Sequence, residues 1–194
     1  MLRFILLSIV AFSGFYLWSV FPVNHGPGEV APNRPDIERI GWEKPFAYKS
    51  AEVIPLRKIS GEVRILEKKR YFFDAKAQHS PIDVLVGWHE MSDERNIEHL
   101  RFNLDDRYFD LGYSKPPLPL NEIFNQINLW HLMASNESID KKIKGLRKGN
   151  IVKLEGFIVD VEFENNYPWK SELKKGKGEH LNNTIVWITD LYVH

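Results

Sequence analysis

The sequence predicts a mainly β (α+β) domain, a small OB-like and partly open β-barrel with one or two helices, preceded by an N-terminal transmembrane helix. Three observations lead to this fold class. A long uncharged run opens the chain, short strand-like runs alternate with turns, and an amphipathic stretch separates the early strands from two later ones. Three strands, a helix and two strands is the order of such a barrel. A mixed α+β sandwich is the alternative.

The first 23 residues are expected to form an uncleaved membrane anchor. Phe4–Val23 carries no charged side chain, and about 20 residues rising 1.5 Å each span a hydrocarbon core of about 30 Å. Arg3 suits a cytoplasmic amino terminus, while Tyr16 and Trp18 suit an interfacial aromatic belt. The run ends without a small-x-small cleavage site, which disfavours a cleaved signal peptide. A buried core helix is the remaining alternative.

The rest of the chain is expected to form a linker, residues 24–45, and one domain, residues 46–194. The linker has prolines at 27, 32 and 35 and glycines at 26, 28 and 41. Because this density disfavours both helices and ladders, the segment should lift the domain off the membrane. We therefore expect a single-pass inner (cytoplasmic) membrane protein whose C-terminal domain lies outside the cytoplasm.

Composition excludes several kinds of function. Twenty-six basic and 26 acidic residues give a formal net charge of zero, so no nucleic-acid partner is expected. With no cysteine, the chain has no disulfide, thiolate metal site or cysteine nucleophile. It also lacks a nucleophile elbow, a phosphate-binding glycine loop and a dinucleotide fingerprint, so no cofactor is expected.

Alternating apolar residues mark the early strands. Glu62–Ile65 alternates polar and apolar residues, and Ile82, Val84 and Val86 share one face of a second run. Residues 97–104 and 107–113 are expected to pair as a hairpin around Asp105 and Asp106.

Two helices are expected next. The first has Asn121 as its N-cap and an apolar face with the spacing of a helix, made of Ile123, Phe124, Ile127, Trp130, His131 and Ala134. The second and shorter helix covers residues 138–146 and ends at Gly149 and Asn150.

Two long strands complete the prediction. In residues 151–163 the apolar positions change from even to odd numbers near Gly156, which indicates a bulge or a sharp bend of the kind that closes small barrels. Residues 185–193 are almost continuously apolar and should form a well-buried strand.

Asp83, Asp93 and His131 are the candidate catalytic residues. Asp83 should share a face with Leu85, where a carboxylate needs a cation or several hydrogen bonds. It is interpreted first as a structural residue that ties down the next loop, with a catalytic acid or base and an exposed carboxylate as alternatives. His131 is interpreted as a core histidine; should its helix approach Asp83, the two would form an acid–base pair.

Trp88, Ser92, Trp169 and Lys170 are the candidate ligand-binding residues. Trp88 is more often a core residue than a platform for a ligand. The run of Ser92, Asp93 and Glu94 is also typical of a helix or turn cap, which is the default interpretation.

Basic residues gather in two runs, one around Lys141–Lys148 and one from Lys170 to Lys177 beside Trp169. Outside the cytoplasm their natural partners are lipid headgroups or wall polymers, and solvated lysines are the alternative. A metal site is not expected, because the fourth residue after His89 is Asp93 where a zincin has its second histidine.

Four short motifs also resemble a family of uncharacterised, membrane-anchored or secreted bacterial proteins. They are Ser80-Pro81-Ile82-Asp83, Gly87-Trp88, Met91-Ser92-Asp93 and Asn128 to His131. The resemblance covers roughly residues 60 to 170. It implies a bacterial envelope setting and no particular activity.

Three functional hypotheses follow. The first is a membrane-tethered binding or assembly module for an envelope protein or polymer. The second is an envelope hydrolase that uses an Asp/His acid–base pair. The third is an accessory subunit of a membrane complex, in which the anchor contacts partner helices.

Overall fold

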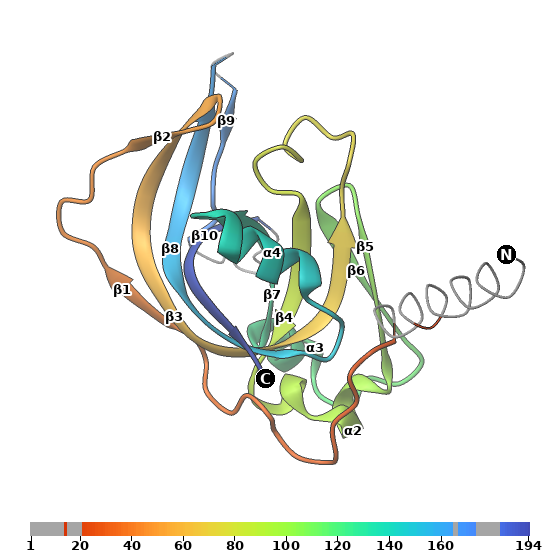
Figure 1. Ribbon diagram of the computed structural model, residues 1–194. Coiled ribbons are helices and arrows are strands. Elements are labelled where there is room, and N and C mark those ends of the chain that lie inside the picture. Colours follow the sequence, from red (N-terminus) through yellow and green to blue (C-terminus); the bar gives the residue numbers. More distant parts are fainter. Residues whose placement is uncertain (1–13, 15–20, 165–166, 174–182) are drawn as a thin grey trace, which may run out of the picture.

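A curved sheet that is partly closed on itself forms the body of the protein (Figure 1). The computed structural model describes residues 14, 21–164, 167–173 and 183–194. Its elements are β1 (Asp36–Arg39), β2 (Phe46–Tyr48), β3 (Ala51–Arg70), β4 (Ile82–Gly87), η1 (His89–Ser92), α2 (Glu94–Ile97), β5 (Leu100–Asp105), β6 (Tyr108–Tyr113), α3 (Leu120–Asn125), β7 (Ile127–Ala134), α4 (Glu137–Gly145), β8 (Ile151–Phe163), β9 (Pro168–Trp169) and β10 (Thr184–Val193).

The long strand β3 closes the sheet because it pairs with two different neighbours. Its second half pairs with β4, and most of its length also pairs with β8. From β4 the sheet continues through β7 and β10 to β8, which returns to β3. The pair of β7 and β10 is parallel, and the other pairs in this circuit are antiparallel. The prediction of a mainly β fold with a partly closed sheet is confirmed.

The main core lies inside this curved sheet. All five strands of the circuit contribute apolar side chains to it, α4 adds Ile139 and Ile143, and the residue that follows α4, Leu146, also belongs to it. A second cluster lies on the outer face of β4 and β7, which the β5–β6 hairpin, α2 and α3 cover. Because both of their faces are covered, every residue of β4 and β7 is buried. A polar side chain on either strand must therefore find its partners inside the protein.

The prediction of a helix from Asn121 to Ala134 is wrong. Only α3 is helical there; its N-cap is Pro119, and Asn121 lies inside it. Residues 127–134 form β7 instead. A strand that is buried on both faces has apolar residues at nearly every position. Some of these positions have the spacing of one face of a helix, so the pattern is also compatible with an amphipathic helix. The helix between the third and fourth strands of the circuit is α4, which agrees with the shorter predicted helix and has Asn136 as its N-cap.

The change of buried face in β8 is present, but the bulges lie in its partner strands. Leu154 and Ile158 face the main core, whereas Val159 faces a third cluster. Register shifts at Leu56 of β3 and Thr189 of β10 insert the extra residues. Because β8 has no extra residue of its own, its side chains continue to alternate between the two sides of the strand. The apolar cluster that they pack against changes along the strand, and this produces the change of buried face.

Gly156 allows β10 to approach β8 closely. A Cβ at this position would lie 2.1 Å from the carbonyl oxygen of Trp187, far inside van der Waals contact. The predicted hairpin is confirmed as β5 and β6, and residues 97–99 precede it in and after α2. The predicted last strand is confirmed as β10, although its end, including Tyr192, is exposed.

The segment expected to be a linker packs on the domain. Residues 36–39 form β1, which pairs with β3, so the prediction that this segment avoids a ladder is wrong there. Ala31 is fully buried, and its backbone bonds to Ser92 and His89. Most of the predicted anchor, residues 1–13 and 15–20, lies outside the described residues. Among the residues that the structure describes, no helix is long and apolar enough to cross a membrane.

Candidate functional site

Asp83 and His131 meet across neighbouring strands. They are direct partners in the register of β4 and β7 and point to the outer face of the sheet. The imidazole Nδ1 lies 2.9 Å from the carboxylate Oδ1 of Asp83, but the two groups are not aligned for a hydrogen bond. The sequence predicted a pair of Asp83 and His131 only on the condition that the two residues come close. The structure shows that they are in contact. The contact arises from a strand register and not from a helix that plugs the barrel.

Arg107 is the cation that the buried Asp83 requires. It follows Asp106 in the tight turn between β5 and β6, where both residues have positive φ, 46° and 67°. This turn directs the guanidinium inward, and its Nη1 donates to Asp83 Oδ1 at 2.7 Å. The same guanidinium pairs with Asp74, with Nε to Oδ2 at 2.5 Å. We call Asp74, Asp83, Arg107 and His131 the buried network.

Tyr71 holds Arg107 from a third side. The guanidinium lies 3.9 Å from the centre of the tyrosine ring, and the Arg107 backbone N–H donates to the tyrosine hydroxyl at 3.2 Å. Burial raises the pKa of Tyr71 to about 12, and the nearby negative charge of Asp83 acts in the same direction. The hydroxyl is therefore neutral throughout the physiological range.

Hydrogen bonds keep Asp74 ionised. Burial alone would raise the pKa of this carboxyl, but hydrogen bonds from the Lys76 backbone N–H and the Arg107 side chain outweigh burial and hold the pKa below its usual value. Lys76 itself has a lowered pKa because burial disfavours its charged form. Within the described residues, Asp83 Oδ2 and His131 Nε2 have no hydrogen-bond partner.

Trp169 covers the two deepest members of this network, Asp83 and His131. Its ring lies 4.9 Å from the ring of His131, and its Nε1 donates to Asn183 Oδ1 at 2.9 Å. The indole is 3% exposed, the imidazole 0% and Asp83 1%. Trp169, a predicted ligand-binding residue, therefore covers two of the three predicted catalytic residues, Asp83 and His131.

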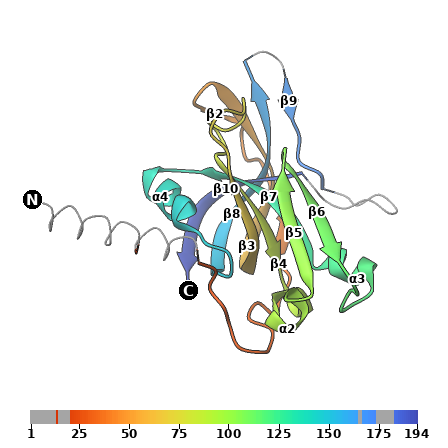
Figure 2. The same ribbon diagram turned by 90° about the vertical axis from the view of Figure 1, so that its right-hand side faces the viewer.

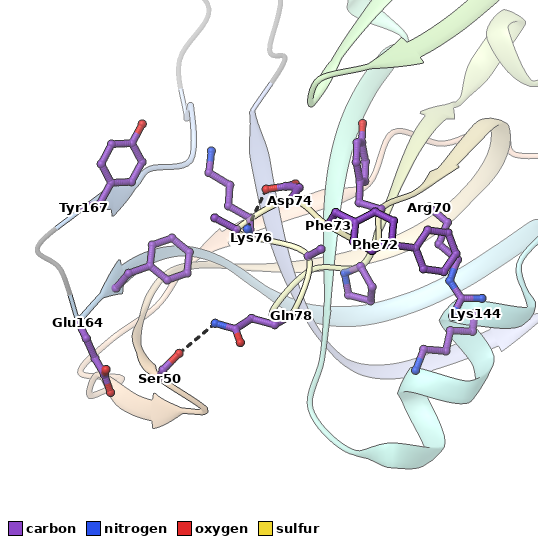
Figure 3. A pocket seen from close by; sticks show the side chains of 15 residues that line it. Ser50, Arg70, Phe72, Phe73, Asp74, Lys76, Gln78, Lys144, Glu164 and Tyr167 are labelled. Atoms are coloured by element: carbon purple, nitrogen blue, oxygen red, sulfur yellow. Dashed lines mark hydrogen bonds between the residues drawn. The ribbon is translucent and has the colours of Figure 1, made fainter.

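An open pocket lies beside the network, and we call it the aromatic pocket (Figure 3). Its volume is about 1150 Å³. The β3–β4 connection, the end of β8 and α4 contribute its walls. The lining side chains include the exposed aromatic residues Phe72, Phe73 and Tyr167, the cations Arg70, Lys76 and Lys144, and the acids Asp74 and Glu164.

A smaller pocket of about 540 Å³ adjoins it. Asp74, Lys76 and Tyr167 line both pockets, and Arg107, Trp169 and Lys170 line only the smaller one. The Lys76 ammonium lies 4.6 Å from the centre of the Trp169 ring. The predicted ligand residue Lys170 therefore lies beside Trp169, at a rim that connects with the aromatic pocket.

Asp93 and Ser92 lie apart from this site and hold local structure. Asp93 is the N-cap of α2 and accepts hydrogen bonds from the backbone and side chain of Arg95. These bonds, with one from the Gly28 backbone, hold the pKa of Asp93 far below its usual value although burial opposes them. Ser92 Oγ donates to the His89 carbonyl oxygen and accepts from the Ala31 backbone N–H. The default interpretation of this motif as a cap is confirmed.

Trp88 is a core residue at a different edge of the sheet. It is 4% exposed, and the Arg34 guanidinium lies 5.9 Å from the centre of its ring. A pocket of about 180 Å³ lies beside it and is also lined by Trp130. The residues weighed for a metal form no suitable group, since no three His, Asp or Glu side chains in the described ranges converge on one point.

Sequence reasoning missed Arg107 and Asp74. Asp105 and Asp106 indicate only the turn of a hairpin, and nothing in that pattern assigns a role to the arginine that follows them. The usable signal was the expectation that Asp83 needs a buried cation. An arginine in a tight turn of the chain is one kind of residue that could provide it.

Neither family models nor curated proteins nor solved structures give a match to the chain.

Proposed function

We propose that the chain is a membrane-tethered ligand-binding module of the bacterial envelope, and that the aromatic pocket is its binding site. The observation that carries this proposal is the combination of exposed aromatic rings and cations around one large open pocket. Phe72 is 67% exposed and Phe73 102%. Large apolar side chains exposed together on a protein surface are characteristic of interaction sites.

An OB-like topology supports this location. The circuit β3, β4, β7, β10, β8, with α4 between its third and fourth strands in chain order, has the strand order of an OB barrel. Such barrels bind oligonucleotides and oligosaccharides with the face of their second and third strands and with the loops after their first and fourth strands. In this protein the outer face of β4 and β7 is covered, so the loops are the part of that surface that remains. Here these are the β3–β4 and β8–β10 connections, which line the aromatic pocket and the smaller pocket.

The lining favours an anionic ligand with planar or apolar parts. Arg107 is paired with Asp74, and Lys144 is paired with Asp140. Of the remaining charged side chains in the lining, the cations Arg70 and Lys76 outnumber the acid Glu164. The volume exceeds the range of about 300–1,000 Å³ that is typical of small-molecule sites. A segment of an acidic envelope polymer suits both the size and the charge.

Binding of short acidic oligosaccharides to the purified full chain, measured by titration calorimetry, tests this proposal. Phe73→Ser is expected to weaken binding by about 1–3 kcal/mol, if the ring contributes as much as an aromatic side chain on which a nucleic-acid base stacks. Trp42→Ser is the matched control, because Trp42 is 100% exposed on the β1–β2 connection and does not line the pocket. Equal binding by the Phe73→Ser and wild-type proteins would refute the pocket as the site.

The hydrolase hypothesis has one favourable observation, the 2.9 Å contact between His131 and Asp83. Against it, both side chains are sealed under Trp169, and a substrate atom has no path to either. A general base must lie within hydrogen-bond reach of the proton that it removes. We therefore assign the pair to positioning Arg107 and not to chemistry.

The proposed location rests on the apolar run Phe4–Val23. It would place the domain outside the cytoplasm with the amino terminus inside. Protease digestion of intact spheroplasts tests this. The domain should be degraded from outside, while release of the chain from membranes by alkaline carbonate would contradict the anchor.

A further inference from the structure

The chain is fastened to the domain at the residue where the proposed anchor ends. Val23 is the last residue of the apolar run, and its backbone N–H donates to the Lys148 carbonyl oxygen at 2.8 Å. Two residues later, His25 Nε2 lies 2.7 Å from the Gly149 carbonyl oxygen, and the His25 backbone N–H donates to Glu94 at 3.3 Å. The start of the segment expected to be a linker is therefore held by the domain.

Gly149 makes this close contact possible. Its φ is +87°, and a Cβ there would lie 1.8 Å from the Val23 carbonyl oxygen. Further along, Ala31 is buried and β1 pairs with β3. A free linker of the length of residues 24–45 would let the domain move by about 25 Å, following the square-root scaling of flexible chains. Because the segment is fastened from its first residues, that freedom is absent.

One face of the domain surrounds the point where the chain leaves the anchor. Figure 2 shows α4 and the carboxyl end of β10 on the same side of the molecule as the start of the red segment, which the structure describes from residue 21 on. We call this side the anchor face. Its exposed side chains include Phe21 at 62%, Tyr192 at 56% and Val193 at 45%. The Lys142 ammonium lies 5.1 Å from the centre of the Tyr192 ring and donates to the Leu191 carbonyl oxygen.

The composition of the anchor face suits a lipid headgroup layer. Aromatic and aliphatic side chains beside lysines are typical of membrane interfaces, where the ring enters the headgroups and the lysine reaches the phosphates. The charge is modest, because Glu67 pairs with Lys148 at 2.9 Å and Asp190 lies beside Tyr192. Contact through Phe21, Tyr192 and Val193 is therefore expected to contribute more than attraction to anionic lipid.

We infer that the domain lies directly on the bilayer through the anchor face, in one orientation, and does not swing on a linker. This inference rests on the proposed membrane anchor. One lining residue of the aromatic pocket, Lys144, belongs to α4 and therefore to an element of the same side.

The absence of cysteine allows a direct test with single labels in the full chain. Tyr192→Cys and Tyr113→Cys, each carrying an environment-sensitive fluorophore, would be reconstituted into phosphatidylethanolamine–phosphatidylglycerol vesicles that contain a headgroup-linked quencher. Tyr113 is 44% exposed at the end of β6, which Figure 2 places on the opposite side from α4. The label at position 192 is expected to be quenched several-fold more than the label at position 113. Equal quenching in vesicle-bound protein would overturn the inference.

Gly149→Ala is expected to reduce this difference, because the added Cβ displaces Val23. Gly145→Ala in α4 is the matched control, since nothing lies within 4 Å of its added Cβ. If Gly149→Ala does not fold, His25→Leu removes the ring contact with less disturbance and should act in the same direction. Retention of the full difference in a folded Gly149→Ala or His25→Leu protein would contradict the proposal that the contacts of Val23 and His25 with residues 148 and 149 fix the orientation of the domain. Failure of the wild-type chain to stay with the vesicles at all would instead contradict the anchor itself.

Discussion

Asp83 and Asp93 are both buried carboxylates that contact an arginine, yet the two sites are built differently. The side chains of Asp83 and Arg107 are 1% and 8% exposed, and 24 residues separate them in the sequence. The side chain of Asp93 is 4% exposed, but that of its partner Arg95 is 68% exposed and only two residues away. The first pair joins distant elements within the fold, whereas the second completes one short helix.

This difference decides what each pair contributes. The buried network connects β4, β7, the β5–β6 turn and the β3–β4 connection, and the last of these also lines the aromatic pocket. Removing one partner of a buried ion pair leaves an uncompensated charge in a poorly solvated place. Removing an exposed arginine costs little stability, because water and dissolved ions take its place beside the carboxylate.

Arg107→Met should therefore be the most damaging change. It leaves Asp74 and Asp83 without their cation and should lower the free energy of unfolding by about 3–5 kcal/mol. Urea denaturation followed by tryptophan fluorescence measures this loss. A decrease in the free energy of unfolding of less than about 1 kcal/mol would show that the ion pairs of the buried network contribute no more than exposed ion pairs do.

His131→Gln should have an intermediate effect. It removes a fully buried ring that packs on Trp169 and contacts Asp83. The expected loss is about 1–3 kcal/mol, as for other disrupted buried polar contacts. Ligand binding to the folded fraction should be unchanged if the histidine only positions its neighbours. A loss of turnover without a loss of stability would restore the hydrolase hypothesis.

The same contrast explains what the sequence could predict. The cap formed by Asp93 depends on residues within two positions, so its local motif was sufficient to identify it. The alternation around Ile82, Val84 and Val86 also placed Asp83 correctly on the other face. The contact between Asp83 and His131 depends on the register of two strands 48 residues apart, and local periodicity assigned one of them to a helix.

Arg107 was less predictable still. Its inward direction depends on two successive residues with positive φ in the hairpin turn. Such a turn is recognisable as a turn, but nothing local indicates which side chain it directs into the protein. The contacts of the buried network could therefore not be predicted from the sequence, because they depend on the pairing of distant strands and on the geometry of a turn.

Asp93→Ala and Asp93→Asn should separate capping from charge. Alanine removes the cap and should cost about 1 kcal/mol. Asparagine caps nearly as well but cannot ionise. Because the folded pKa of Asp93 is depressed, its ionised form stabilises the fold above the unfolded pKa of about 3.9, and this contribution is lost as the pH falls toward the folded pKa. The acid slope of stability below about pH 4 should then be shallower in Asp93→Asn than in wild type. Identical slopes would contradict an ionised native Asp93.

Arg95→Met should have the smallest effect, although its partner is as buried as Asp83. Asp93 would keep hydrogen bonds from the backbone N–H groups of Arg95 and Gly28 when the guanidinium is lost. The remaining electrostatic contribution acts through an exposed side chain, so it should vanish in 1 M salt, where the screening length is about 3 Å. Denaturation midpoints of wild type and Arg95→Met at low and high salt measure this. A difference that persists at high salt would mean that Arg95 acts through packing, and the contrast with Arg107 would then be one of degree.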